Sequence, residues 1–344
     1  MPESVPESEI LVKVWRGDYV ESLHRGSIAV VDTAGSVVAA VGDPDYYTFM
    51  RSAAKPIQAL AVIESGAYAT YGLTERELAV VCASHSSEPD HVENVLGILA
   101  KVGLDETHLR CGTHLPTHGP SAQALVREGR QPTSVHCNCS GKHSGMLAVA
   151  RQMGWTLEDY WRREHSLQRL CRENVAAVAG YPIDKMGTAT DGCGVSVFAL
   201  PLRNMAQAFA RLANPDDPRS AFSPERAAAA RLVARSMRAY PEMVGGTGRL
   251  CTALMRATPV VAKSGAEGVY CFGIPGRSLG VALKIDDGNA RGTHPTAVRV
   301  LEQLGLLSAE AAAALEPFRR PANINNRGEN VGYTEAVFQI RKSR

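Results

Sequence analysis

The feature that most limits the fold is where strand-like and helix-like segments fall along the chain. Short apolar, β-branched runs lie near both ends, whereas helical composition and periodicity dominate the middle. The expected strands are 10–14, 27–32, 36–41, 259–262, 268–272, 279–285 and 333–339, and the expected helices are 56–65, 74–82, 91–102, 144–153, 157–178, 196–212, 223–239 and 293–304. This order predicts an α/β protein in which both chain ends share one antiparallel sheet flanked by helices, with a mostly helical domain inserted between them.

The expected domain boundaries lie near Gly245-Gly246, where helix-like segments give way to short strand-like runs, and near Gly66, where the first expected helix ends. A chain of 344 residues is long enough for two domains. We therefore expect residues 1–66 and 245–344 to form the sheet domain and residues 67–244 to form the helical insertion.

Charge and composition exclude several classes of protein. Lys and Arg number 37 against 35 Asp and Glu, so the chain lacks the basic excess of a dedicated nucleic-acid binder. It has no uninterrupted apolar run of about 18 residues to span a membrane. The N-terminal MPESVPESEI resembles no secretory signal, and eight cysteines are not dense for this length. We expect a cytoplasmic protein whose cysteines are free thiols or metal ligands.

Two serine–lysine motifs suggest nucleophilic catalysis. In Ser52-Ala-Ala-Lys55, a helical spacing of three places the amine near the hydroxyl, where a neutral lysine could take the serine proton. The alternative is an exposed lysine one turn after a helix-capping serine. Lys263-Ser264-Gly265 follows an apolar strand, and penicillin-binding proteins and class A β-lactamases carry both motifs in this order. Ser84 is the candidate for their middle element, although it could also be a capping loop serine.

A second group of reactive residues could bind a metal. Residues 136–143 (HCNCSGKH) hold two cysteines and two histidines, and Asp191-Gly-Cys-Gly194 follows about fifty residues later. Thiolates and imidazoles suit zinc, but the spacing is not that of a C-x-x-C pair. Buried free cysteines and a core histidine are the alternative interpretation.

These motifs, taken in order, resemble one family. The blocks are Arg51–Pro56 (RSAAKP), Ala83-Ser-His-Ser86, Asn138–Met146 (NCSGKHSGM), Thr190–Gly194 (TDGCG), Lys263–Tyr270 (KSGAEGVY) and Lys284–Asn289 (KIDDGN). Together they are similar to the Rhizobium-type, or class 3, L-asparaginases, often labelled asparaginase II, over roughly residues 10–340. The resemblance implies a serine β-lactamase- and glutaminase-like fold.

The resemblance also implies a site. It pairs Ser52 with Lys55 and Ser84 with Lys263, and it implies a zinc ion held by Cys139, Lys142 and Cys193, which Asp191 reaches through water. Arg51, Asp191 and Glu267 are the candidates for substrate binding. The implied reaction is hydrolysis of the small molecule L-asparagine to L-aspartate and ammonia through an acyl-enzyme, by a homodimer that needs neither nucleic acid nor a membrane.

Two other functions stay open on the residues alone. One is another serine amidase or a penicillin-recognising hydrolase on the same scaffold. The other is a non-catalytic module that binds zinc or an amino acid and in which the serine is inert. Which serine is the nucleophile also stays open.

Overall fold

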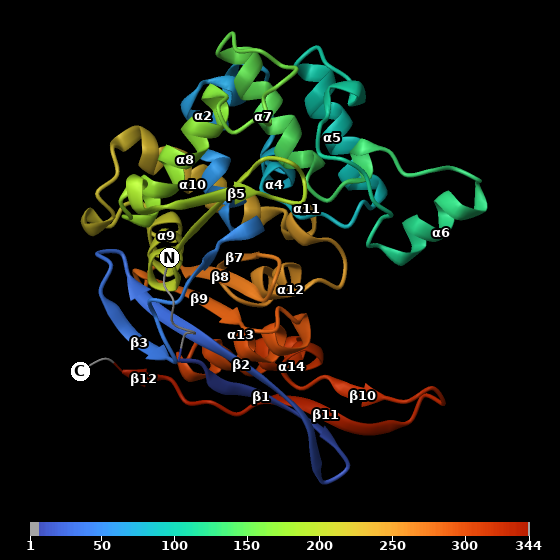
Figure 1. Cartoon of the computed structure of the whole chain (residues 1–344), viewed down its shortest axis with the longest axis vertical. Helices are drawn as coiled ribbons and strands as arrows, with labels where there is room; N and C mark the ends of the chain where they lie inside the picture. The colour runs from blue at the N-terminus through green and yellow to red at the C-terminus, as the bar shows by residue number, and fades with distance from the viewer. Residues whose placement is uncertain (1–6, 343–344) are drawn as a thin grey trace. The chain divides into compact units, whose positions relative to one another are not determined.

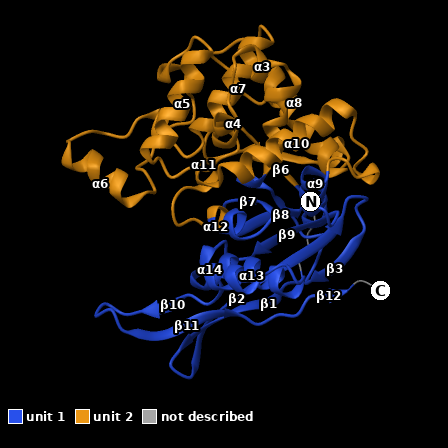
Figure 2. Ribbon diagram, turned by 180° about the vertical axis from the view of Figure 1, so that it is seen from behind, with its two compact units in different colours: residues 1–53, 200–214, 253–344 blue, residues 54–199, 215–252 orange. Residues whose placement is uncertain are grey.

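The computed structural model describes residues 7–342, and the chain forms two compact units (Figure 2). Unit 1 consists of residues 1–53, 200–214 and 253–344, and unit 2 of residues 54–199 and 215–252. Residues 1–6 of the N-terminal segment considered above lie outside the described range. Unit 1 includes residues 200–214, which come from within the expected helical domain.

A large antiparallel sheet organises unit 1 (Figure 1). Its strands run in the order β10-β11-β1-β2-β9-β8-β7, with β3 beside β2 and β12 beside β3. Their bounds are β1 Glu9–Arg16, β2 Tyr19–Asp32, β3 Val37–Val41, β7 Val261–Ser264, β8 Val269–Ile274, β9 Leu279–Ile285, β10 Ala322–Ile324, β11 Asn330–Ala336 and β12 Arg341–Lys342. The short β4, Tyr47–Phe49, does not belong to this sheet. The N-terminal strands β1 and β2 lie between strands from the C-terminal part of the chain, which confirms the predicted shared sheet.

Helices cover both faces of this sheet. The backbone of α9 (Leu202–Ala213) lies so close to Gly280 of β9 that an added Cβ would be 2.1 Å from the Ala206 carbonyl oxygen. On the opposite face, Ile285 of β9 lies against Gly292 of α13 (Ala290–Gln303). Residues 280 and 285 are an odd number apart and therefore point to opposite faces. α14 (Ala309–Arg319) packs against α13.

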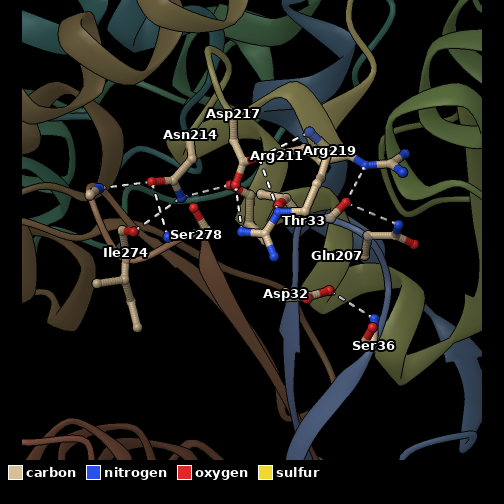
Figure 3. A network of polar contacts seen from close by, with 12 residues as sticks. Asp32, Thr33, Ser36, Gln207, Arg211, Asn214, Asp217, Arg219, Ile274 and Ser278 are labelled. Atoms are coloured by element: carbon tan, nitrogen blue, oxygen red, sulfur yellow. Dashed lines mark hydrogen bonds and ion pairs between the residues drawn. The ribbon is translucent and has the colours of Figure 1, made fainter.

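Asn214 fixes the end of α9 to the β8–β9 turn (Figure 3). Its amide nitrogen donates to the carbonyls of Ala210 (2.9 Å) and Ile274 (3.1 Å). Its amide oxygen accepts from the backbone N–H groups of Gly276 (2.7 Å) and Ser278 (3.3 Å). One buried side chain thus satisfies polar groups from a helix and a turn.

Unit 2 is mostly helical. Its α-helices are α1 Lys55–Gln58, α2 Leu60–Glu64, α3 Ala67–Thr70, α4 Glu75–Val81, α5 Pro89–Lys101, α6 Gly119–Arg127, α7 Ser140–Gln152, α8 Ser166–Ala179, α10 Pro224–Ala239 and α11 Pro241–Gly245, while α12 (Leu250–Ala257) crosses into unit 1. The hairpin of β5 (Gly187–Thr190) and β6 (Ser196–Pro201) completes it. A capping box of Thr74 and Glu77 starts α4, as the expected helix at 74–82 requires.

Helix α7 is the core of unit 2, with every residue from Ser140 to Ala150 buried. Two glycines let it approach α4 closely. A Cβ on Gly141 would lie 2.1 Å from the Val80 carbonyl oxygen, and one on Gly145 would lie 2.6 Å from a Val81 methyl carbon. The glycines in the CSGKHSG block therefore have a packing role.

Three sequence-based boundaries were wrong. α7 starts at Ser140 rather than 144, so Lys142 is helical. α8 starts only at Ser166, where His165 accepts the Leu167 N–H as N-cap, and residues 157–165 form turns. Residues 196–201 are strand β6 rather than helix, and α9 begins after Pro201. No helix within residues 7–342 is both long and apolar enough to cross a membrane.

Candidate active site

Lys55 and Ser84 meet in the interior of unit 2. Lys55 is the first residue of α1 and is only 1% exposed, and its Nζ donates to Ser84 Oγ at 3.0 Å and to the Ala83 carbonyl at 2.6 Å. Fully buried lysines are rare unless their ammonium groups are paired. The sequence had suggested Ser52 as the partner of Lys55, but the contact in the structure is to Ser84, 29 residues further along the chain.

The loop after α4 holds Ser84 in a fixed position. Its backbone N–H donates to the Val244 carbonyl at 3.1 Å, and the next N–H, of His85, donates to Asn138 at 3.2 Å. The Ser86 hydroxyl donates to the Gly245 carbonyl at 2.8 Å. Ser87 adopts a positive φ of 60°, a strained conformation that such bonds can maintain.

His85 connects this loop to the start of α7. Its Nδ1 accepts the Ser87 N–H at 3.2 Å, so the ring proton lies on Nε2, which is 2.8 Å from Ser140 Oγ. Ser140 in turn donates to the Val135 carbonyl at 2.8 Å. Burial, aided by His91 and Lys55, holds the pKa of His85 well below its ordinary value. His85 is therefore a neutral hydrogen-bond donor.

The predicted metal ligands form a buried cluster beside the same helix. Cys139 is the N-cap of α7, and Lys142 lies in its first turn. Lys142 Nζ is 3.0 Å from Cys193 Sγ, which is 3.9 Å from Asp191 Oδ2. Asp191 and Cys193 follow β5, where the Asp191 N–H donates to the Val195 carbonyl at 2.8 Å. The structure thus brings together four residues that the sequence separates into two blocks.

Electrostatics in this cluster favour one thiolate paired with an ammonium group. Hydrogen bonds from the Cys137 and Cys193 thiols lower the pKa of Cys139 well below its usual value, although burial opposes them. Burial also works against the charge of Lys142, but the neighbouring sulfurs and the Asp191 carboxylate raise the pKa of Lys142 overall. Without a metal, the proton stays on the lysine.

The donor set fits zinc only if Lys142 is a ligand. In the described part of the chain, no three His, Cys, Asp or Glu side chains gather as a metal site. Two sulfurs and one amine nitrogen do gather here, and thiolate sulfur with nitrogen is a donor set that zinc accepts. The metal would have to displace the Lys142 proton, which makes its affinity dependent on pH.

His143 is the next residue on α7 and is fully buried. Its Nδ1 forms a hydrogen bond of 2.7 Å with the Tyr160 hydroxyl, which also accepts the Arg110 N–H at 3.0 Å. The other ring nitrogen, Nε2, has no hydrogen-bond partner among the described residues. His143 therefore stays beside the cluster as a neutral side chain, since burial and Lys142 lower its pKa.

Unit 1 holds the other serine and the other lysine on neighbouring segments. Ser52 lies in a short 3-10 helix, Arg51–Ala54, whose first residue has a φ of 51°. Two residues before Ser52, the Met50 carbonyl oxygen lies so close to Gly265 that a Cβ there would be 2.9 Å away. Lys263, fully buried on β7, lies two residues before Gly265. The Ser52 segment and the Lys263-Ser264-Gly265 segment are therefore neighbours.

Lys284 fixes the loop that follows Lys263. Its Nζ donates to the backbone carbonyls of Glu267 (2.5 Å) and Ile285 (2.8 Å). Burial lowers the pKa of Lys284, against the attraction of the nearby Asp286 and Glu267 carboxylates. Glu267 has a φ of 56°, and its side chain is exposed. Sequence reasoning quoted Lys284 within a motif but gave it no role, and His85 was missed in the same way.

The predicted site residues thus fall into two groups. Unit 2 holds Lys55 and Ser84 with Cys139, Lys142, Asp191 and Cys193, and unit 1 holds Arg51, Ser52, Lys263 and Glu267. The pairing of Ser84 with Lys263 spans both units and stays a prediction. In the sequence, the Lys55–Ser84 contact is indicated only by the short, polar segment 84–88, which follows α4.

Comparison with known proteins supplies the family. The model of the L-asparaginase II family matches residues 12–336. No curated protein matches the chain. Among solved structures, "Mglu in its native form" is 15% identical at a TM-score of 0.41, over 82% of this chain and 65% of that one, so the chain spans just under two thirds of Mglu.

Two further structures have comparable scores. A Bacillus glutaminase is 13% identical (TM-score 0.39, over 82% of this chain and 91% of that one), and a beta-lactamase from Mycobacterium bovis is 18% identical (0.41, 82% and 95%). These likenesses are too distant to assign a substrate or a mechanism. The family match covers nearly the whole chain, together with every motif block above, and it shows that the chain belongs to the L-asparaginase II family of amidohydrolases.

Proposed function

We propose that the protein hydrolyses the side-chain amide of L-asparagine to L-aspartate and ammonia through a serine acyl-enzyme. The observation that carries this proposal is the buried Lys55 amine, 3.0 Å from Ser84 Oγ and three residues after Ser52 in the sequence, in a member of an amidohydrolase family. A neutral lysine amine beside a serine hydroxyl can accept its proton without solvent.

In the proposed reaction, Ser52 Oγ attacks the amide carbon and its proton passes to Lys55. The tetrahedral oxyanion is stabilised by backbone N–H groups near Ser52 or after Lys263. When the C–N bond breaks, the nitrogen takes the proton held by Lys55 and leaves as ammonia. Water then adds to the acyl carbon and gives its proton to the Ser84–Lys263 network; the bond from Ser52 Oγ to the acyl carbon breaks, Ser52 Oγ takes a proton back, and aspartate is released. Arg51, Asp191 and Glu267 are the candidates to bind the charged ends of the substrate.

The Lys55–Ser84 contact favours a variant of this mechanism in which Ser84 is the nucleophile and Lys55 is its base. The two mechanisms differ in which serine carries the acyl group. We also propose a zinc ion at Cys139, Lys142 and Cys193, where a bound metal would supply a fixed positive charge. The homodimer implied by the family and the cytoplasmic location expected from the N-terminal sequence and the cysteines stay predictions.

The test is ammonia release from L-asparagine and L-glutamine by the full chain, beside Ser52→Ala, Ser84→Ala and the control Ser121→Ala on α6. We expect release from asparagine, lost by about a thousandfold or more in the nucleophile variant and unchanged in Ser121→Ala. Acid quenching and peptide mass spectrometry then locate the aspartyl group on residue 52 or 84. Failure to release ammonia from a folded protein would refute the proposal, and turnover of a cephalosporin instead would indicate a penicillin-recognising hydrolase.

Metal content tests the zinc ligands separately. We expect purified wild-type protein to hold zinc and Cys139→Ser to lose most of it, because only two proposed ligands remain. Cys271→Ser is the matched control, since this buried free thiol lies on β8 in unit 1. Equal zinc in both variants would reject Cys139 as a ligand.

A further inference from the structure

A cavity of about 310 Å³ in unit 2 has no role in the proposed reaction. It lies between the start of α8 and the β5–β6 hairpin, and its lining includes Arg163, Arg169, Arg172, Thr188 and Ser196. The size is at the lower end of the range for small-molecule sites, about 300 Å³ and above. We call it the arginine pocket.

Its three guanidinium groups have no acidic partner. Within residues 7–342, no carboxylate forms an ion pair with Arg163, Arg169 or Arg172, and each is bonded only to neutral groups. Some other arginines of this unit do form ion pairs; Arg226, for example, lies 2.8 Å from Glu64. No acidic residue lines the arginine pocket. The pocket therefore concentrates positive charge in a concavity.

Two buried polar atoms of the lining also lack partners. Arg172 Nε and Thr188 Oγ1 are both shielded from solvent and form no hydrogen bond among the described residues. Native structures rarely leave such groups unsatisfied, so each needs an explanation. An N–H donor and a hydroxyl at one cavity match the acceptors of an oxyanion, and guanidinium groups bind oxyanions with paired hydrogen bonds.

From these observations we propose that the arginine pocket is a second binding site, separate from the Lys55–Ser84 site, for a small doubly charged oxyanion. A phosphate group and a dicarboxylate such as succinate share the required chemistry. Because three unpaired arginines face the cavity, a dianion is favoured over a monoanion such as chloride.

The arginine pocket is also connected, through strand β5, to the buried cluster of Cys139, Lys142 and Cys193. Thr188 lies in β5, paired with Phe198 of β6, and Asp191 and Cys193 follow β5 directly. A ligand that binds Thr188 would order this hairpin and so the loop that positions Cys193. The anion would then act as an effector of the site without contacting it.

Binding is measured by calorimetry on the full chain with inorganic phosphate, succinate or chloride at constant ionic strength. We expect phosphate or succinate to bind, and Arg163→Gln/Arg169→Gln to weaken binding by about tenfold or more. Both arginines are exposed, so the variant should fold. Arg127→Gln/Arg130→Gln, at the last residue of α6 and three residues after it, removes the same charge elsewhere and should bind like wild type. The tighter of the two ligands identifies the source of the oxyanion.

A second variant isolates the hydroxyl. Thr188→Val keeps the shape of the side chain and should lower the affinity while leaving the fold intact. Hydrogen exchange of the peptide spanning residues 187–199 should slow when the anion binds to wild-type protein. The proposal is overturned if neither dianion binds, or if both arginine double variants bind equally. Neither readout depends on asparagine turnover, so this result is independent of the proposed function.

Discussion

The substitution Gly141→Ala tests the packing on which the candidate site depends. An added Cβ would lie 2.1 Å from the Val80 carbonyl oxygen and 2.8 Å from its carbon, whereas ordinary contact begins at 3.4 Å. The gap to the oxygen must therefore grow by 1.3 Å (3.4 minus 2.1). Backbone atoms on α4 cannot rotate away as a flexible side chain would, so α7 must move instead.

Two effects oppose each other in this variant. Alanine improves helix propensity by about 1 kcal/mol over glycine, and overpacking a core costs about 1–3 kcal/mol. Because the clash is with backbone, the cost should reach the upper end, leaving a net loss of about 2 kcal/mol in unfolding free energy. A shift of about 1 Å in Cys139 and Lys142 should lower activity about a hundredfold.

Urea unfolding, zinc content and ammonia release measure these effects on the same preparation. The control is Gly97→Ala in the middle of α5, where the nearest heavy atom to the added Cβ is the Glu77 carboxylate oxygen at 3.4 Å. That variant should gain up to about 1 kcal/mol and keep its activity. If Gly141→Ala is as stable and as active as Gly97→Ala, the close approach of α7 to α4 does not determine the site.

Two other predictions concern stability. Asn214→Ala leaves the Ile274 carbonyl and the Gly276 N–H without their buried partner, so unfolding free energy should fall by about 2 kcal/mol in a urea titration, and a loss below about 0.5 kcal/mol would contradict this role. Burial lowers the pKa values of His85 and His91 in the folded protein, so the unfolded chain takes up protons first as pH falls below 6.5. The unfolding free energy should then decrease by up to about 1.4 kcal/mol per pH unit for each histidine. Its dependence on pH should be weaker in His85→Gln than in the wild-type protein. The same dependence in both would show that His85 does not contribute to the loss of stability.

Local signals in the sequence predicted much of the fold. Ser223 with Pro224 marked the start of α10, and the structure has Ser223 accepting the Arg226 N–H as N-cap. The strand at 279–285 was predicted with its observed bounds. Local sequence signals are enough to predict such elements, because helix caps and alternating apolar residues act over only a few positions.

Sequence reasoning failed where distant contacts decide the structure. Residues 196–201 are apolar and fit a helix or a strand, and pairing with β5 makes them a strand. The spacing of Ser52 and Lys55 indicated a local pair, yet Lys55 donates to Ser84, which only the packing of α1 against the loop after α4 brings close. The metal ligands were assigned through family resemblance, since their spacing matched no common zinc motif.

Buried lysines occur in both groups of candidate site residues. Four of the eight lysines, Lys55, Lys142, Lys263 and Lys284, are at most 6% exposed. Burying an ammonium group is costly even with good partners, and a fold alone would be served better by an apolar side chain of similar size. Lys284 has a positioning role, because it bonds the carbonyls that shape the loop after Lys263. The other three lie beside a hydroxyl, a thiol or the strained segment that carries Ser52. In the proposed function, each of these three amines would supply a proton or a metal ligand.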